Sequence, residues 1–401
     1  MKSGINAGMN SGLKIGIIGY GTRMHYFLDR LLELDAGVAV VAVADIDTAK
    51  AAALLAEKGI ASPAVRMYED ADEMLEREAL DGVMIGTRCK LHAEMAVKAM
   101  SRNLPLFLEK PVGITFADLQ LLSEAAETSS SEVVVSFPLR NTPVALLAKE
   151  IIDSGRLGSI EHAQAVNNVP YGGVYYHSWY RDERETGGLF LQKATHDLDC
   201  LNFLLGLRPV TVSAMASKRV FRGDKPAGLK CGDCADNRVC PESPYVLKTF
   251  RQEEVTGDGC AFATDTGNHD SASVLIRYET GMHAVYSQNF YSRKAAARRG
   301  ARLIGYEGTV EFDWYRDEVK VFMHGSPRVE TYKLEAAKLP HFGGDSALAQ
   351  NFIGVMEGRE KSATPLSMGI ASALICLEAE RSSASDAFRT IPDFTVEGAV
   401  R

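Results

Sequence analysis

The sequence has no apolar run long enough to cross a membrane, and its first residues lack the apolar core of a signal peptide. It also lacks a positive charge balance, since the formal net charge is −8 and the pI about 5.7. These values argue against nucleic acid and anionic membranes as main partners. Residues 1–12, rich in Gly, Ser and Asn, are expected to form a flexible leader. Seven cysteines in such a chain indicate a reducing compartment, so we expect a cytoplasmic protein.

Length and composition predict two domains. A chain of 401 residues exceeds what one core usually fills, and 46% hydrophobic residues can bury a sizeable interior. From residue 13 to residue 137, short apolar runs alternate with helical patterns, which indicates a doubly wound parallel sheet of the Rossmann type. Residues 138–401 are expected to form a second, α+β domain for substrate binding and oligomerisation.

A glycine-rich turn follows the first predicted strand. Gly19 permits a tight turn, and Gly21 lets the backbone approach a pyrophosphate at the start of a predicted helix that runs through Leu34. The third glycine of the dinucleotide fingerprint is missing, because Met24 occupies its place. The alternative is an ordinary strand-to-helix turn without a ligand. On the dinucleotide interpretation, the turn offers four cofactor contacts: Gly19, Gly21, Thr22 and Arg23.

Asp45 closes the second predicted strand, residues 38–44, where a carboxylate can accept hydrogen bonds from ribose hydroxyls. A carboxylate at this position repels a 2′-phosphate, and the following Ile46 and Asp47 supply no arginine to hold one. The sequence therefore favours NAD over NADP. A surface aspartate without a ligand is the alternative.

Lys110 lies at the boundary between the two predicted domains. Leu106–Leu108 forms a short buried strand that Pro111 cannot extend, so the lysine is held at a carboxyl end of the sheet, where such sheets bind ligands. A poorly hydrated ammonium there has a lowered pKa and exchanges protons near neutral pH. The alternative is a solvated Glu109/Lys110 pair.

Two stretches of the second domain carry candidate substrate contacts. Residues 171–181 combine aromatic rings with Trp179 and Arg181, which suits the C–H faces and hydroxyls of a carbohydrate; the alternative is a packed loop. Residues 187–199 read as a double glycine entering a helix, with Gln192 and His196 four residues apart on one face. From residue 271 to residue 333, alternating patterns predict a large antiparallel sheet.

Residues 219–260 form a polar, cysteine-rich insert. Cys231 and Cys234 have the spacing with which two thiolates hold one zinc, and Cys240 with Cys260 would complete a tetrahedral structural site. Free thiols or a redox pair are the alternatives.

Gly19-Tyr20-Gly21, Asp45, Thr87 followed by His92, and Glu109-Lys110-Pro111 resemble the glucose-fructose oxidoreductase/inositol dehydrogenase/rhizopine-catabolism (Gfo/Idh/MocA) family, from Leu13 onward. The resemblance implies a Rossmann domain followed by an α/β domain on a large open sheet, and NAD(P)-dependent oxidation or reduction of a secondary alcohol on a sugar or cyclitol. It adds Thr87, His92, Glu109 and Lys110 to the cofactor contacts. Arg88-Cys89 stands where Pro-Asn is typical.

The resemblance also assigns roles to the helical segment. His196 is expected to face the nicotinamide and the substrate carbinol, as the base on the substrate oxygen, while Lys110 stabilises or shares the proton. Gln192 stands where dehydrogenases with a full Lys/Asp/His set carry aspartate, and Lys193 is its neighbour; both are expected to contact substrate with Trp179, Arg181 and His196. A subgroup of the family with a Cys-x2-Cys…Cys-Pro insert supports a clustered cysteine site.

Two other functions fit the same residues. One is NAD-dependent glycoside cleavage through transient oxidation and elimination, which turns over without net NADH. The other is a sugar sensor on an enzyme fold, although the presence of both Lys110 and His196 counts against it. A homodimer or homotetramer is expected, because one face of the predicted sheet pairs with another subunit in the family.

Overall fold

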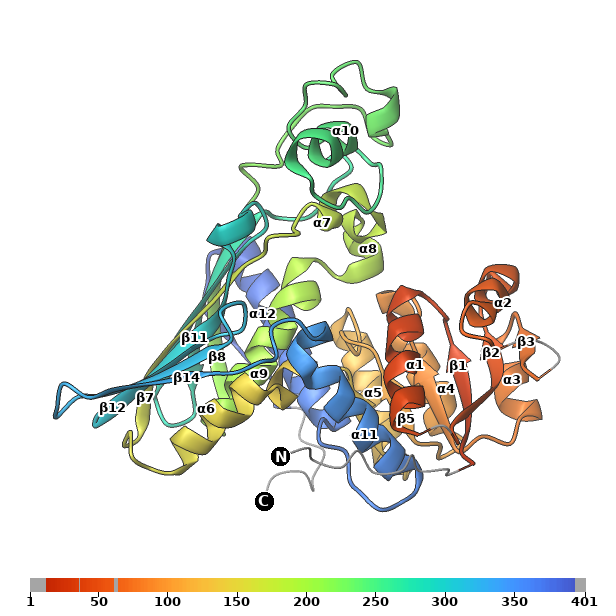
Figure 1. The fold of residues 1–401 in the computed structure, drawn as a ribbon, viewed down its shortest axis with the longest axis horizontal. Coiled ribbons are helices and arrows are strands. Elements are labelled where there is room, and N and C mark those ends of the chain that lie inside the picture. Colours follow the sequence, from red (N-terminus) through yellow and green to blue (C-terminus); the bar gives the residue numbers. More distant parts are fainter. Residues whose placement is uncertain (1–11, 36, 61–63, 394–401) are drawn as a thin grey trace. The chain divides into compact units, whose positions relative to one another are not determined.

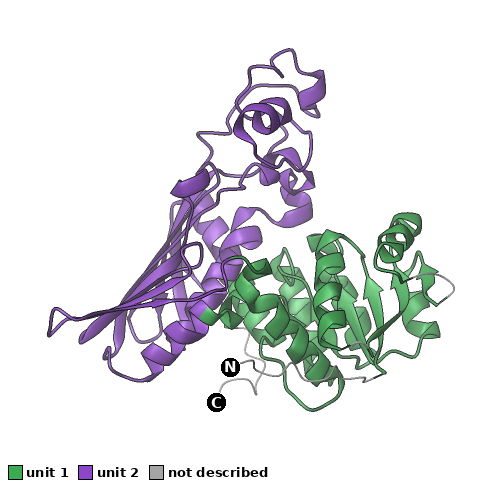
Figure 2. Cartoon of the chain, in the orientation of Figure 1, with its two compact units in different colours: residues 1–143, 338–374, 393–401 green, residues 144–337, 375–392 purple. Residues whose placement is uncertain are grey.

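The computed structural model describes residues 12–35, 37–60 and 64–393, and these divide into two compact units (Figures 1 and 2). Unit 1 comprises residues 1–143, 338–374 and 393–401, and unit 2 comprises residues 144–337 and 375–392. Most of the expected flexible leader, residues 1–11, lies outside the described residues. No helix in the described ranges is long and apolar enough to span a bilayer.

Unit 1 is a six-stranded sheet in the order β3-β2-β1-β4-β5-β6, with every pair parallel. Its strands are β1 Lys14–Ile18, β2 Ala39–Ala44, β3 Arg66–Tyr68, β4 Gly82–Ile85, β5 Leu106–Leu108 and β6 Val133–Val135. Its helices are α1 Thr22–Leu34, α2 Thr48–Ala56, α3 Ala71–Arg77, α4 His92–Met100, α5 Phe116–Thr128 and α11 Gly344–Met356, with 3-10 turns η1 Cys89–Leu91, η2 Pro138–Asn141 and η8 Pro340–Gly343. This order is that of the Rossmann fold.

The core of unit 1 includes a helix from far along the chain. The buried positions of α1, including Phe27, recur at helical spacing and face the sheet. Phe27 stacks on Phe107 of β5 at 3.7 Å between ring centroids, and Phe352 of α11 lies 6.0 Å from Phe107. The sequence placed residues 338–374 in the second domain; the structure packs them with unit 1, because the apolar face of α11 completes its core.

Unit 2 is built on a nine-stranded sheet in the order β14-β13-β12-β11-β7-β10-β9-β8-β15. Only the β10–β7 pair is parallel among its described pairs. The strands are β7 Ile160–Asn168, β8 Pro209–Ser217, β9 Ser271–Tyr278, β10 His283–Asn289, β11 Arg298–Gly305, β12 Gly308–Asp313, β13 Glu318–Met323, β14 Val329–Lys333 and β15 Arg389–Thr390. The predicted fold class, a parallel Rossmann sheet plus an α+β domain with a mostly antiparallel sheet, is confirmed.

The helices of unit 2 include several short ones. They are α6 Pro143–Asp153, α7 Val174–His177, α8 Glu183–Thr186, α9 Thr195–Leu205 and α10 Pro244–Val246, with turns η3 Trp179–Arg181, η5 Cys231–Asp233 and η7 Lys294–Ala296. Two π-helical turns, η4 Phe190–Ala194 and η6 Leu247–Arg251, interrupt the α-helical geometry. The last helix, α12 Leu366–Ser385, runs from unit 1 into unit 2.

Candidate active site

The turn between β1 and α1 has the geometry of a phosphate-binding loop. Gly19 has a φ of +80°, and a side chain there would meet the backbone nitrogen of Thr87 at 2.7 Å, so only glycine fits. Gly21 is the N-cap of α1 and makes no side-chain capping bond, and both Gly21 and Thr22 are exposed. The first N–H groups of α1 therefore remain available to an anion, which is how dinucleotide pyrophosphates bind.

Met24, which replaces the third glycine of the fingerprint, is accommodated by Gly86, which directly follows β4. Met24 is fully buried, and a Cβ on Gly86 would lie 2.3 Å from its Cγ. In the usual fingerprint the third glycine permits close packing of helix on strand. Here Gly86 provides the space instead, so the departure at Met24 leaves the turn intact.

Asp45 is fixed at the end of β2 by two backbone bonds. Its Oδ2 accepts from the N–H of Tyr20 at 2.7 Å, and its Oδ1 accepts from the N–H of Asp47 at 2.8 Å. Each carboxylate oxygen can accept a further bond. Ile46, beside it, is 96% exposed, so the carboxylate sits next to an uncovered apolar surface.

The loop that carries Lys110 is held from both sides. Buried His92 donates from Nδ1 to the carbonyl of Pro111 at 2.7 Å, and its Nε2 lies 3.2 Å from the carbonyl of Thr87. Burial lowers the pKa of His92, which keeps the ring neutral. Further on, Asp118 accepts bonds from the N–H groups of Ile114 and Thr115 at 2.9 Å each. His92 therefore supports the Lys110 loop through backbone carbonyls instead of presenting its ring to solvent.

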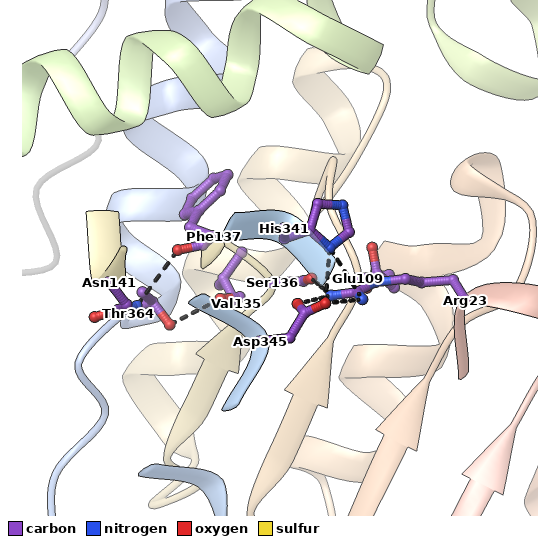
Figure 3. A network of polar contacts seen from close by, with 9 residues as sticks. All are labelled: Arg23, Glu109, Val135, Ser136, Phe137, Asn141, His341, Asp345 and Thr364. Carbon is purple, nitrogen blue, oxygen red and sulfur yellow. Dashed lines mark hydrogen bonds and ion pairs between the residues drawn. The ribbon is translucent and has the colours of Figure 1, made fainter. Parts of the chain in front are cut away.

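Arg23 is engaged by two carboxylates (Figure 3). Its Nε donates to Glu109 at 2.7 Å, and its two terminal nitrogens donate to the two oxygens of Asp345 at 2.8 and 2.7 Å. One of these nitrogens also donates to Ser136 Oγ at 3.1 Å. Arg23 thus ties α1, the Glu109 loop and α11 together, and its expected role as a cofactor contact stays a prediction.

Asp345 carries one of the two carboxylates that bind Arg23. The N-cap of α11 is Gly343, and Asp345 lies in the first turn, where it also contacts His341 Nδ1 at 2.7 Å. Burial alone would raise the pKa of Asp345, but the bonds from His341 and Arg23 hold it well below its usual value. Asp345 is therefore ionised at neutral pH.

In unit 2, the segment that carries His196 begins with a π-turn. The N–H of Thr195 bonds to the carbonyl of Phe190, five residues back, before α9 continues in α-helical geometry. Such turns occur often at functional sites. Gln192 is buried and donates from Nε2 to the carbonyl of Thr186 at 3.0 Å, so its amide holds the preceding turn. His196 is also buried.

The other expected substrate contacts of unit 2 have different surroundings. Lys193 Nζ donates to the hydroxyl of Tyr171 at 2.6 Å. The ring of Trp179 stacks on Tyr180 at 4.0 Å. Arg181 forms an ion pair with Asp265 at 2.6 Å, so its charge is compensated within unit 2. Substrate contact by these residues stays a prediction, and for Arg181 it would require breaking this pair.

The four cysteines of the insert are free thiols. A β-bridge between Lys230 and Gly259 brings the chain at Cys231 beside the chain at Cys260, and both thiols are buried. Burial, with the charges of the other three thiols adding, raises the pKa of Cys231 to about 12. Across residues 12–35, 37–60 and 64–393, however, no group of three or more His, Cys, Asp or Glu side chains is arranged to hold a metal. Structural zinc stays a prediction from spacing alone.

Comparisons with known proteins agree with this organisation. Residues 13–137 match the model of the oxidoreductase family with an NAD-binding Rossmann fold, and residues 145–311 match the GFO/IDH/MocA C-terminal domain. The chain is 26% identical over 349 residues to "Putative oxidoreductase YteT" of Bacillus subtilis (strain 168), covering 75% of this chain and 81% of that protein. It is 30% identical over 194 residues to inositol 2-dehydrogenase of Salmonella typhimurium (strain LT2), covering 48% of this chain and 54% of that protein.

Among solved structures, levoglucosan dehydrogenase in complex with NADH and levoglucosan has a TM-score of 0.75 at 19% identity, covering 95% of this chain and 100% of that one. At this identity the match concerns the fold. The two family models together cover well over half of the chain. The predicted resemblance is confirmed: the chain belongs to the GFO/IDH/MocA family of NAD-binding oxidoreductases.

Proposed function

We propose that this protein is an NAD-dependent dehydrogenase that acts on a secondary hydroxyl of a sugar, sugar derivative or cyclitol. The observation that carries the proposal is the set of groups at the carboxyl ends of β1, β2 and β5 in unit 1: the uncapped start of α1, the fixed carboxylate of Asp45, and the Lys110 loop. The names of the relatives, inositol 2-dehydrogenase and levoglucosan dehydrogenase, suggest the substrate class.

The preference for NAD over NADP rests on Asp45. Its carboxylate is held in place by the N–H of Tyr20, so it cannot turn away from a 2′-phosphate without losing that bond. The uncovered side chain of Ile46 suits the face of an adenine ring. Replacing Asp45 with alanine should weaken NADH binding and bring the affinities for NADH and NADPH closer together. Fluorescence titration with each cofactor measures both affinities.

Bound nicotinamide supplies the hydride acceptor, and the protein handles the proton. We propose that Lys110 donates a hydrogen bond to the substrate oxygen and stabilises the negative charge that develops on it. His196 takes the hydroxyl proton in oxidation and returns it in reduction. Gly19 and Gly21 hold the phosphates, and Asp45 holds the ribose hydroxyls.

The test is NADH formation by purified protein with NAD and a panel of cyclitols, hexoses and glycosides. Lys110→Ala should abolish turnover, while Lys90→Ala, an exposed lysine of η1, should not. NADH formation with one substrate class, lost in Lys110→Ala, supports the proposal and names the class. Glycoside consumption without net NADH would replace it with cleavage by transient oxidation, and sugar binding without turnover would replace it with a sensor.

We also propose that the open face of the unit 2 sheet pairs with a second copy of the chain. Along β9 the exposed residues alternate with buried ones, and Leu275 on this strand is 49% exposed while Met215 on β8 is 77% exposed. The same face carries both signs of charge, as in the pair of Arg302 with Glu311. A homodimer or homotetramer is expected by light scattering, and Leu275→Glu should shift it toward monomer. All seven cysteines are free, in keeping with the proposed cytoplasmic location.

A further inference from the structure

Gln192 cannot act as an acid or base in the proposed site, because an amide side chain does not take up or release a proton. Its amide is also turned to the carbonyl of Thr186. The adjacent residue, Lys193, is titratable, and it lies three positions before His196, so the two occupy neighbouring turns of one helical segment. The contacts of Lys193 therefore decide whether this segment holds a second group able to move a proton.

Lys193 is buried, and among the described residues no carboxylate forms an ion pair with it. Its side chain is 7% exposed, and within the described part of the chain the polar contact of Nζ is with the hydroxyl of Tyr171, at 2.6 Å. The ammonium also lies over two rings, 4.6 Å from the centroid of Tyr171 and 5.6 Å from that of Tyr175. A buried ammonium is costly unless a negative or polarisable group compensates it. The phenol oxygen of Tyr171 is the group placed to do so.

Tyr171 is half-exposed, whereas Lys193, to which it is hydrogen-bonded, is buried. Its side chain is 49% exposed, and it follows β7 in a loop pressed against the end of β10. The close approach occurs at Gly172, where a Cβ would lie 1.8 Å from the carbonyl oxygen of Phe290. The loop is therefore fixed by backbone packing, and the hydroxyl of Tyr171 is held against the buried ammonium of Lys193.

Charged groups around Tyr171 both raise and lower its pKa. Desolvation of the phenol by the surrounding protein would by itself raise the pKa of Tyr171, but the positive charges of Lys193 and Arg299 and the bond from Lys193 outweigh it and lower the pKa, while Asp197 acts the other way. Asp197 is itself bound to Arg299 Nε at 2.6 Å, which limits its effect. Tyr315 and Tyr175 border the same cluster, and both have raised pKa values because they are buried.

We propose that Tyr171 is a catalytic acid–base group of the reaction and that Lys193 positions and polarises it, supplying the titratable function that Gln192 lacks. The proposal rests on the proposed dehydrogenase function. In oxidation, His196 takes the proton as the O–H bond of the substrate breaks, and the Tyr171 phenolate accepts that proton from His196 in a new O–H bond. The hydride of the same carbon passes to nicotinamide, so the alcohol is oxidised to a ketone and NAD is reduced. Tyr171 then releases the proton to water.

The first test needs no cofactor or substrate. Tyrosine ionisation is followed by ultraviolet absorbance in the wild type and in Tyr171→Phe, Lys193→Met and Tyr306→Phe, the last an exposed tyrosine in the turn between β11 and β12. We expect one tyrosine that ionises before the others, lost in Tyr171→Phe, moved to higher pH in Lys193→Met, and kept in Tyr306→Phe. If no tyrosine ionises before the others, Lys193 does not polarise Tyr171 and the proposal fails, whatever reaction the protein catalyses.

The second test is kinetic. Tyr171→Phe should lower kcat by about 10²- to 10⁴-fold with little change in KM, as for loss of an acid–base group. Lys193→Met, which keeps the length of the side chain, should move the pH optimum of oxidation to higher pH, and Tyr306→Phe should match the wild type. If Lys110→Ala is inactive while Tyr171→Phe keeps wild-type kcat, the dehydrogenase stands and this proposal fails. If no substrate yields NADH with the wild type, both fail.

Discussion

Replacing Asp345 with asparagine should weaken unit 1 more than any exposed ion-pair change. The two oxygens of Asp345 accept bonds of 2.8 and 2.7 Å from Arg23, and the side chain of Asp345 is 4% exposed against 25% for Arg23. Removing one partner of a buried pair costs about 3–5 kcal/mol. Because Arg23 keeps Glu109 and some contact with water, we expect a smaller loss than this, about 2–3 kcal/mol.

In a unit of this size, such a loss corresponds to about 5–10 °C in the midpoint of thermal unfolding. The assay is far-UV circular dichroism together with hydrogen exchange of the α1 and α11 amides. The chain's two tryptophans, Trp179 and Trp314, both lie in unit 2, so tryptophan fluorescence follows the other unit. The matched control is Glu357→Gln at the end of α11, whose pair with Arg359 is more exposed and should contribute less than about 1 kcal/mol.

The effect should depend on pH in one direction. The pKa of Asp345 is depressed in the folded state, so its contribution is present above the unfolded value of about 3.9 and is lost as the pH falls below it. The difference between wild type and Asp345→Asn should therefore be constant near neutral pH and shrink in acid. A variant as stable as the wild type at pH 7, with unchanged exchange in α1, would refute the role assigned to this ion pair.

Three further predictions concern Gly86, His269 and the four cysteines of the insert. Gly86→Ala places a Cβ 2.3 Å from Met24 Cγ, so it should destabilise by about 1–3 kcal/mol in denaturant titrations, and adding Met24→Ala should recover part of that loss. Burial lowers the pKa of His269 to about 4, below its unfolded value of about 6.5. The free energy of unfolding should therefore fall by at most about 3 kcal/mol as the pH drops from about 6.5 to about 4. His269→Gln should remove this dependence on pH. If the four cysteines bind structural zinc, protein purified without chelator should contain about one zinc per chain, and Cys231→Ser should lose it. Protein that is as stable without zinc as with it would contradict the zinc prediction.

The elements of unit 1 could be predicted from the sequence because each one carries its own pattern. The predicted strand before Gly19 became β1, and the predicted helix through Leu34 became α1. Short elements without a pattern escaped prediction: β3 Arg66–Tyr68 has three residues, and its identity as a strand comes from pairing with β2. β8 Pro209–Ser217 was also missed, although it is held on both sides by β9 and β15.

The positions of the site loops were predictable, but the directions of their side chains were not. Gly19 and Asp45 follow strands of the same parallel sheet, so their proximity follows from the order of the strands. One of the two carboxylate partners of Arg23 is Asp345, 322 residues away, and no local pattern indicates that pairing. The same holds for Gln192, whose direction depends on a π-turn that α-helical periodicity does not predict.

These side-chain directions change how a departure from a family motif should be interpreted. Met24 departs from the fingerprint, yet Gly86, directly after β4, supplies the missing space, so the turn is unchanged. Gln192 departs too, but no neighbour turns it into a proton carrier; its amide holds a backbone carbonyl. A compensated departure preserves the original function, whereas an uncompensated one requires another group to act. In unit 2 the group that we propose for this is the hydroxyl of Tyr171, which accepts a hydrogen bond from the buried ammonium of Lys193, so the ionisation of Tyr171 is the quantity to measure.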